Sequence, residues 1–421
     1  MNMLSVSVSG NYLEKNGKPF FYLADTCWSA FTNISDTEWV YYLEKRRAQG
    51  FNVVQINILP QWDASPTLLE HDPFERIDGA WDYSRMKEEY FEHAASMCVM
   101  AKAYGFELAL VVLWCNYVPD TWASRFYKMG IMPKDAIAAY IDKVNETFSC
   151  FDPVYVISGD TDFNTPLCES YYIEAFDRLK ELAPDCLFTT HIKGRYTYIP
   201  ERLADGLDLL FYQSGHNHND LAMPYKLALE MREKYPGKPI INGEPCYEEM
   251  GFSGGRSGRW HRADIVRAAW ESVLSGASAG IAYGAAGIYS WHMAGTMFGS
   301  SIGEGFAAPK PWQDALNFEG AWDYGFLAYW IGLYQLYDLV PDPGFLAREY
   351  EGVRVAKCAR GHVLYMPYNV PLKTTLALKG VRATILDLER RYVSVMEIPD
   401  ETDTLPIHPF HRDVVVLLEK A

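Results

Sequence analysis

Residues 85–114, RMKEEYFEHAASMCVMAKAYGFELALVVLW, join one helical pattern to one strand pattern across a single glycine. Gly105 is a typical residue for the end of a helix. The run 106–114 after it is almost continuously apolar, which is typical of a strand buried on both faces. The stretch therefore predicts a helix over 85–104 and a parallel strand over 106–114. In the helical part, apolar and small residues recur at steps of three or four, along one helix face: Met86, Tyr90, Ala94, Met97, Ala101 and Tyr104.

The same alternation of strand and helix recurs along the chain. A hairpin over 5–24 leads into the first strand, and Ser35 with Glu38 forms a capping box that starts the first helix. Eight such units require a parallel sheet, and a doubly wound sheet would carry a glycine-rich nucleotide loop that this chain lacks. The pattern therefore predicts a (β/α)₈ TIM barrel. Its further strands are expected within 51–59, 106–114, 153–158, 187–191, 207–213, 239–243 and 279–291, and its further helices within 85–104, 134–150, 166–183, 199–203, 221–235 and 261–275.

The pattern changes after residue 340. Short β-type runs follow one another, separated by turn residues, at the spacing of a small all-β sandwich. We therefore predict a hairpin and catalytic barrel over 1–340 and a β-sandwich accessory domain over 341–421. The strands of the second domain are expected at 353–358, 362–366, 374–378, 383–387, 392–396 and 414–418.

Composition excludes some partners. The 421 residues carry a formal net charge of −16 with no run of Lys or Arg, which argues against a nucleic-acid partner. No apolar stretch approaches a membrane span, and the N-terminus has no pattern of a signal peptide. The 8 cysteines are scattered without CxxC spacing, which favours buried free thiols and a cytoplasmic protein. Aromatic residues reach 15%, which suits a sugar-binding site but also the filling of a large core.

Polar and aromatic residues stand where most of the predicted barrel strands end. Active sites of such barrels lie at the carboxyl ends of the strands. One polar residue there could merely solvate the rim, but a ring of them suits a pocket that holds hydroxyl groups and stacks on a sugar ring. The residues predicted to bind substrate are Asp25, Trp28, Gln55, Trp114, His191, Gln213, Tyr247 and Trp291, and Asn57 and Asp162 are further candidates.

Two carboxylates are the candidate catalytic residues. Ser158-Gly159-Asp160 ends the fourth strand, and Asn242-Gly243-Glu244 ends the seventh. Glycosidic cleavage needs one protonated acid for the leaving group and one carboxylate that attacks or directs water. A small residue before each acid allows a close approach of the backbone. The alternative is that each acid forms a structural salt bridge with an arginine at the rim.

Several neighbouring residues have weaker or different interpretations. His216-Asn217-His218 has the spacing of a metal site, but no further ligand pattern completes a shell, so we predict no metal and no cofactor. Asp162 could bind substrate or cap the next helix. Glu248 and Glu249 are expected to be exposed to solvent. Tyr247 could donate a hydrogen bond to the Glu244 carboxylate or could simply pack.

Three segments resemble one known family. NGKPFFYLADTCWSAF (16–31), VYVISGDTDFN (154–164) and KPIINGEPCYEE (238–249) resemble motifs of the apiosidase-like glycoside hydrolases, family 140 of the sugar-cleaving enzymes. The resemblance implies that Asp160 is the acid/base, that Glu244 is the nucleophile, and that an exo-acting enzyme releases terminal apiose from pectin fragments or plant glycosides. It also implies a sandwich domain after the barrel. The chain has Ser158-Gly159 where the family usually has two glycines.

The function therefore has one leading hypothesis and several open alternatives. The hypothesis is a retaining glycosidase in which Glu244 attacks and Asp160 protonates the leaving oxygen, with the two carboxyls about 5–5.5 Å apart. Another sugar, such as an arabinofuranoside or a β-glucan, is one alternative. A non-catalytic carbohydrate-binding barrel and a metal-dependent barrel hydrolase are the others. In the leading case the partner is a small carbohydrate or plant glycoside.

Overall fold

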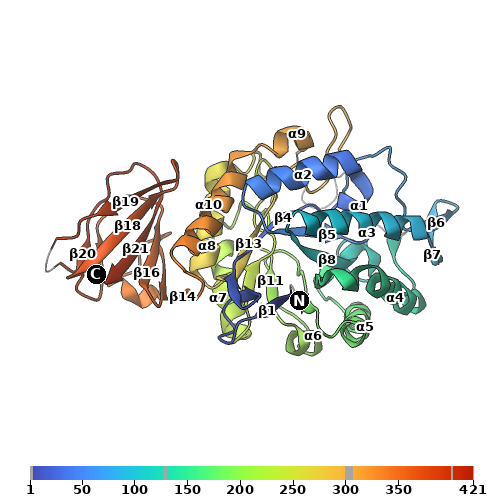
Figure 1. Ribbon diagram of the computed structural model, residues 1–421, viewed down its shortest axis with the longest axis horizontal. Coiled ribbons are helices and arrows are strands. Elements are labelled where there is room, and N and C mark those ends of the chain that lie inside the picture. The colour runs from blue at the N-terminus through green and yellow to red at the C-terminus, as the bar shows by residue number, and fades with distance from the viewer. Residues whose placement is uncertain (1–2, 127–129, 299–306, 400–401, 421) are drawn as a thin grey trace.

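The computed structural model describes residues 3–126, 130–298, 307–399 and 402–420. Eight parallel strands form a nearly closed barrel, which confirms the predicted fold (Figure 1). Between the two outermost strands, the N–H groups of Asp208 and Leu209 donate to the carbonyl of Phe188 at 3.0 and 3.4 Å. These two bonds join the edges of the sheet. In spatial order the strands are β10 (Leu187–Thr189), β9 (Val154–Gly159), β8 (Glu107–Trp114), β5 (Val53–Asn57), β4 (Tyr22–Thr26), β13 (Gly280–Tyr283), β12 (Ile240–Asn242) and β11 (Leu210–Tyr212).

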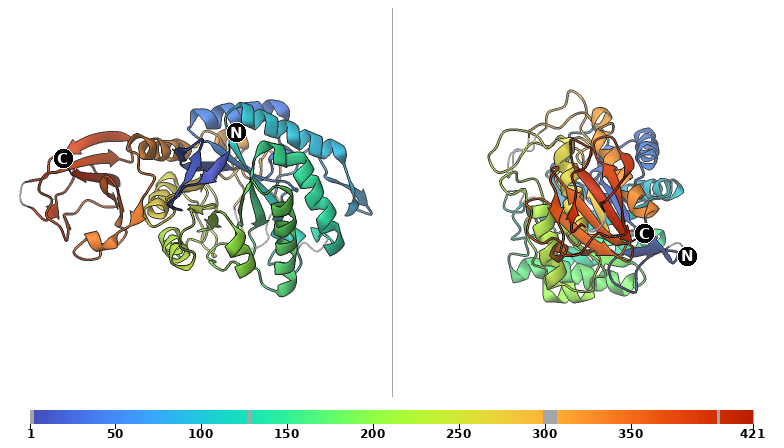
Figure 2. Two further views of the ribbon diagram at one scale, coloured as in Figure 1. Left: turned by 60° about the horizontal axis from the view of Figure 1, so that its bottom comes forward. Right: turned by 90° about the vertical axis from the view of Figure 1, so that its left-hand side faces the viewer.

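Helices surround the barrel (Figure 2). The predicted capping box is present, since the Glu38 carboxylate accepts the Ser35 N–H at 3.0 Å. The helix predicted from residue 85 begins three residues later, because residues 80–86 form a strand. The helices are α1 (Ala30–Asn33), α2 (Asp36–Ala48), α3 (Glu88–Ala103), α4 (Ile137–Phe148), α5 (Pro166–Leu182), α6 (Glu201–Gly206), α7 (Met223–Lys234), α8 (Arg262–Leu274), α9 (Trp312–Ala315) and α10 (Glu319–Leu333).

Two small antiparallel sheets accompany the barrel. β6 (Phe74–Ile77) and β7 (Ala80–Met86) form a hairpin between β5 and α3 that the sequence prediction missed. At the amino end, β1 (Leu4–Val6), β2 (Leu13–Lys15) and β3 (Lys18–Phe20) form a three-stranded sheet that leads into β4. Lys15 binds Glu107, the first residue of β8, at 2.6 Å. This sheet therefore covers the end of the barrel opposite the carboxyl ends of the strands.

A separate antiparallel sheet follows the barrel (Figures 1 and 2). The predicted strand at 374–378 is wrong. Thr374 forms only a single bridge with Leu346, and residues 375–378 are not part of a strand. The six strands, in spatial order, are β14 (Val340–Pro341), β15 (Arg354–Cys358), β16 (Gly361–Met366), β21 (Val414–Lys420), β18 (Val381–Asp387) and β19 (Tyr392–Met396), and β17 (Leu372–Lys373) pairs separately with β20 (Thr404–Leu405).

This C-terminal sheet is buried on both faces. Along β21, Val415 and Leu417 pack into the core of the barrel, whereas Val414 and Val416 pack into a second core with Leu372 of β17. The alternation follows from the two-residue period of a strand. The barrel therefore covers one face of the sheet through α8, which contacts β15 and β16. The pair β17–β20 and its loops cover the other face.

Two general features bear on where the protein works. Within the described ranges, no helix combines the length and the apolar character needed to cross a membrane. All eight cysteines are free thiols, and six of them are buried.

Candidate active site

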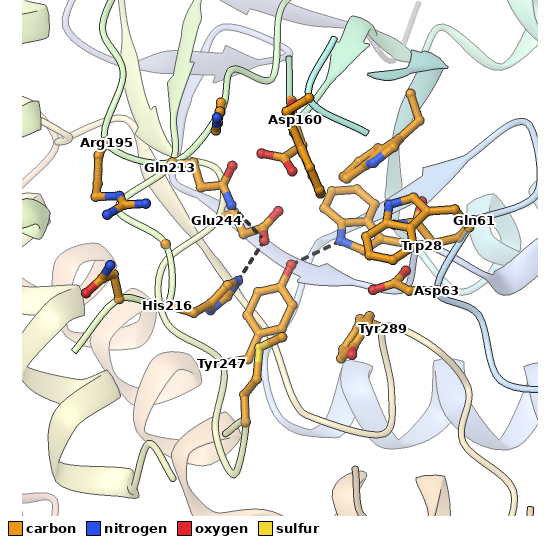
Figure 3. A pocket seen from close by; sticks show the side chains of 18 residues that line it. Trp28, Gln61, Asp63, Asp160, Arg195, Gln213, His216, Glu244, Tyr247 and Tyr289 are labelled. Atoms are coloured by element: carbon orange, nitrogen blue, oxygen red, sulfur yellow. Dashed lines mark hydrogen bonds and ion pairs between the residues drawn. The ribbon is translucent and has the colours of Figure 1, made fainter. Parts of the chain in front are cut away.

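A cavity of about 290 Å³ opens where the barrel strands end (Figure 3). Its walls carry both predicted catalytic carboxylates, Asp160 and Glu244. Aromatic rings form much of the remaining surface, which suits the apolar faces of a sugar ring. These aromatic residues are Trp28, Trp62, Trp114, Trp122, Tyr247 and Tyr289.

Glu244 follows β12 and is held by three side chains. Its Oε1 atom accepts the Gln213 amide at 3.1 Å and lies 2.9 Å from Nε2 of His216. Its Oε2 atom lies 3.0 Å from Nε2 of His191. Burial would raise the pKa of Glu244, but the hydrogen bonds from His191 and His216 outweigh burial and lower the pKa to about 2. Glu244 is therefore an ionised carboxylate at any pH near neutrality.

The same histidine connects Glu244 to Asp160. Nδ1 of His191 accepts the backbone N–H of Asp160 at 3.1 Å, so this nitrogen carries no proton. The nitrogen that can donate is therefore Nε2, which faces Glu244. One imidazole thus sets the position of both carboxylate-bearing segments.

Asp160 follows β9 in a left-handed backbone conformation with φ of 48°. Such a conformation is uncommon for a residue with a Cβ and persists when its surroundings fix it. Both backbone groups are fixed here, since Trp122 also donates Nε1–H to the Asp160 carbonyl at 2.8 Å. Burial, followed by the negative charge of Glu244, raises the pKa of Asp160 well above its ordinary value. The pKa values of these two carboxyls are therefore shifted in opposite directions, which favours the protonated state for Asp160 and the ionised state for Glu244.

Glycines beside the two acids make room for aromatic rings. A Cβ on Gly159 would lie 2.0 Å from Cε3 of Trp114, and one on Gly243 would lie 2.8 Å from Phe211. The sequence interpretation that these positions need small residues is therefore correct, but a packed ring, and not only substrate, requires the space. Trp28 lies 5.2 Å from Trp114 between ring centres and donates Nε1–H to the Tyr247 hydroxyl at 3.0 Å.

The structure brings most predicted site residues together. Trp28, Trp114, Gln213 and Tyr247 line the cavity with the two acids. His191 contacts Glu244 from behind the cavity wall. The structural arginine salt bridge considered for Glu244 is not what holds it, because its partners are two histidines and a glutamine.

Asp25 is not at the cavity, which corrects the sequence prediction. In β4, alternate side chains point to opposite faces. Tyr22 points into the barrel, where it contacts Phe211, so Asp25 points outward to α2. There Asp25 accepts hydrogen bonds from Arg46 Nε at 2.6 Å and Tyr42 at 2.7 Å. The carboxylate is part of a structural ion pair.

Gln55 and Trp291 are also outside the cavity lining. Gln55 lies inside the barrel below the cavity, where it accepts from Tyr22 and donates to the Gly243 carbonyl at 3.0 Å. It therefore supports the segment that carries Glu244. Trp291 is fully buried and stacks on Trp312 of α9, with ring centres 4.5 Å apart.

Two acidic neighbours also differ from expectation. Glu248 is buried and not exposed, because it accepts hydrogen bonds from the Tyr283 hydroxyl at 2.6 Å and the Gly320 N–H. Asp162 does not cap α5: the capping side chain is Thr165, which accepts the Cys168 N–H. Asp162 instead accepts a hydrogen bond from Asn164 at 2.7 Å.

Sequence reasoning missed functional candidates on the loops. The spacing of His216 and His218 gave no sign of a role at the acids, yet His216 binds Glu244, and His218 packs on Phe252 with ring centres 3.9 Å apart. The other missed residues lie beyond the strand ends, where strand patterns give no signal. They are Gln61, Trp62, Asp63, Trp122, Lys193, Arg195 and Tyr289.

Comparison with known proteins points to one group. Residues 7–338 match the family model described as "Apiosidase-like, catalytic domain". A solved structure titled "Glycoside hydrolase" has 22% sequence identity and a TM-score of 0.82, covering 100% of this chain and 97% of its own. A glycoside hydrolase family 5 protein from Bacteroides vulgatus has 21% identity and a TM-score of 0.82, covering 100% and 93%. At these identities the two structures support the fold. A search of curated protein sequences gave no match.

Proposed function

The chain belongs to the apiosidase-like family of glycoside hydrolases, and from that premise we propose that it is an exo-acting, retaining glycosidase that releases terminal apiose or a similar furanose. The substrate is a plant glycoside or a pectin fragment. One observation carries the proposal: two carboxyls in a single cavity have pKa values shifted in opposite directions, toward the protonated state for Asp160 and toward the ionised state for Glu244. Burial and the charge of Glu244 raise the pKa of Asp160, while His191 and His216 lower the pKa of Glu244 to about 2.

These states match the two steps of a double displacement. Ionised Glu244 attacks the anomeric carbon, and protonated Asp160 gives its proton to the departing glycosidic oxygen. The product of this step is a covalent glycosyl ester on Glu244 and a free alcohol. Asp160 then takes a proton from water, whose oxygen attacks the same carbon and releases the sugar and the Glu244 carboxylate.

The size of the cavity supports exo action. At about 290 Å³ it is near the lower end of the range of small-molecule sites, which is about 300–1,000 Å³. A long groove for several sugars on both sides of the bond would suit an endo-glycanase better. The aromatic walls and the few polar groups suit a single terminal sugar with part of its leaving group.

We further propose that the chain divides at residue 340. The barrel would occupy 1–340, and the accessory β domain, with the character of a sandwich, 341–421. The family match that ends at residue 338 and the second apolar core around Leu372 and Leu405 support this division. The free, mostly buried thiols are compatible with the predicted cytoplasmic location.

One experiment tests the reaction and the sugar together. Wild-type protein and Glu244→Gln are incubated with apiose-containing glycosides and, in parallel, with arabinofuranosides, xylosides and β-glucans. We expect wild type to release free apiose fastest, with the first-formed anomer retained in proton NMR, and Glu244→Gln to release none. Faster release of another sugar would replace apiose as the substrate. Inversion of the anomer would contradict the covalent step, and no release from any glycoside would contradict the proposed function.

A further inference from the structure

The cavity contains a third carboxylate that the mechanism above does not use. Asp63 lies on the loop after β5, is only 8% exposed, and lines the same wall as Trp28 and Tyr289. Figure 3 shows its carboxylate directed toward the interior of the cavity. Among the residues that the structure describes, none donates a hydrogen bond to its Oδ1 atom. A buried acceptor without a donor costs free energy unless a ligand supplies one.

The loop presents Asp63 in a fixed position. Asn57, the last residue of β5, donates its side-chain amide to Gln61. Gln61 in turn forms a hydrogen bond with Asp63. Two residues further on, the Ser65 N–H donates to the Ser290 carbonyl at 2.9 Å and its carbonyl accepts the Asn33 amide at 2.7 Å. A relay of amides and an anchored loop thus hold the Asp63 side chain in place at the cavity wall.

The surroundings of Asp63 differ from those of a carboxylate in a structural ion pair. A buried carboxylate is usually paired with a cation, as Asp25 is with Arg46. The side chains that influence Asp63 are instead Gln61, Glu244 and His216. Burial, and then the negative charge of Glu244, raises the pKa of Asp63 to about 7. The cations of the cavity wall, Lys193 and Arg195, follow β10, and Figure 3 shows Arg195 on the opposite side from Asp63.

We propose that Asp63 binds hydroxyl groups of the terminal sugar, and that the sugar site therefore accepts a neutral polyhydroxylated ring and rejects a uronate. The inference rests on the proposed function, since it assigns the ring that is cleaved. A sugar hydroxyl at the cavity wall donates to the Asp63 carboxylate. A uronate would bring a further carboxylate beside Glu244 and Asp63, and like charges in one buried cavity repel.

The test uses 4-nitrophenyl glycosides of apiose, arabinofuranose, xylose and glucuronic acid with the full chain. The variants are Asp63→Asn, which keeps one acceptor, and Asp63→Ala, which keeps none. Glu70→Gln is the matched control, because Glu70 is exposed on the same loop and is not part of the cavity lining. We expect kcat/KM for the best neutral sugar to fall roughly 10-fold in Asp63→Asn and 100-fold in Asp63→Ala. The control should match wild type, and the glucuronide should be the poorest substrate of wild type.

Binding gives a readout that does not depend on turnover. The free sugars that correspond to these glycosides are titrated into each protein, and the fluorescence of the cavity tryptophans is followed. Wild type should bind the preferred neutral sugar saturably and Asp63→Ala should bind it at least 10-fold more weakly, with unfolding temperatures close to wild type. If Asp63→Ala does not fold, Asp63→Asn carries the comparison. Unchanged binding and turnover in a folded Asp63 variant, preference for the glucuronide, or no saturable binding by wild type would each overturn the inference. Absence of turnover with intact sugar binding would overturn only the proposed function.

Discussion

Nδ1 of His191 accepts the backbone N–H of Asp160 at 3.1 Å, and this bond determines which ring nitrogen can donate a proton. The other nitrogen then presents its N–H to Glu244 at 3.0 Å. Position and protonation of the two carboxyls are therefore coupled through a side chain that does not itself line the cavity. A proton on Nδ1 would place a donor against the Asp160 N–H, so Nδ1 is the accepting nitrogen of this ring.

Replacement of His191 by Asn should raise the pKa of Glu244, because one of the hydrogen bonds that lower it is lost. The carboxylate must be ionised to attack, so the acidic limb of the profile of kcat/KM against pH should move to higher pH. At the pH optimum, kcat/KM should fall roughly 10²-fold, because loss of the ring would displace both Asp160 and Glu244.

The control for this experiment is His261→Gln, whose side chain is 70% exposed and pairs with Glu249 instead of Glu244. It should leave the acidic limb where it is in wild type. An unchanged acidic limb in His191→Asn would show that this ring does not tune Glu244.

Asp160→Asn and Glu244→Gln should fail in different ways. Asp160→Asn removes the proton for the leaving group and should lower kcat by roughly 10²–10⁴-fold on glycosides with poor leaving groups. The loss should shrink on aryl glycosides whose phenolate leaves without a proton. Glu244→Gln should abolish turnover of both substrate types, since a neutral amide replaces the carboxylate that attacks. Equal losses in both variants across a series of aryl leaving groups would contradict the assigned roles.

Gly159→Ala tests the packing that positions the acid. The added Cβ would lie 2.0 Å from the Trp114 ring, so the ring or the strand end must move. We expect destabilisation of about 1–3 kcal/mol and a loss of activity larger than the loss of folded protein. Gly344→Ala is the control, because its Cβ would meet nothing closer than Asp342 at 4.0 Å. Melting curves measure the loss of stability, and kcat/KM measured on the same samples shows whether activity falls further than the loss of folded protein.

The barrel could be predicted because its signals are local and repeated. Capping at Ser35, the glycine stop at Gly105 and the apolar strand after it each specify one element, and the structure has all three. The hairpin over 74–86 was missed because its residues alternate poorly and its burial is partial. The strand expected at 374–378 failed because Thr374 pairs at a single position and the chain then turns.

The sequence predicts site residues best where they stand just past the end of a strand. Asp160 and Glu244 stand just past strand ends, where side chains reach the cavity whichever face the strand presents. Asp25 stands inside a strand, and a single-residue difference in parity turns its carboxylate to Arg46 instead of the cavity. Asp63 lies six residues beyond Asn57, on a loop whose path only tertiary contacts determine.

The contact between the barrel and the C-terminal sheet should make the free energy of unfolding depend on pH. Glu271 of α8 is buried against β15, with Oε1 3.9 Å from an Arg354 nitrogen. Burial, opposed by Arg354, raises the pKa of Glu271 from 4.5 to about 7. The folded state therefore binds more protons than the unfolded state between these values, and the free energy of unfolding falls as pH rises from about 4.5 to 7.

Glu271→Gln removes this titration. Relative to wild type, the variant should gain about 2 kcal/mol in free energy of unfolding between pH 5 and pH 8. The comparison across pH is the critical one, because effects of the substitution that do not depend on pH cancel in it, and the pKa of about 7 already includes the attraction to Arg354. Urea unfolding of wild type, Glu271→Gln and the exposed control Glu233→Gln at both pH values measures it. A difference between wild type and Glu271→Gln that stays constant with pH, or that shrinks toward pH 8, would mean that Glu271 is ionised in the folded protein throughout this range.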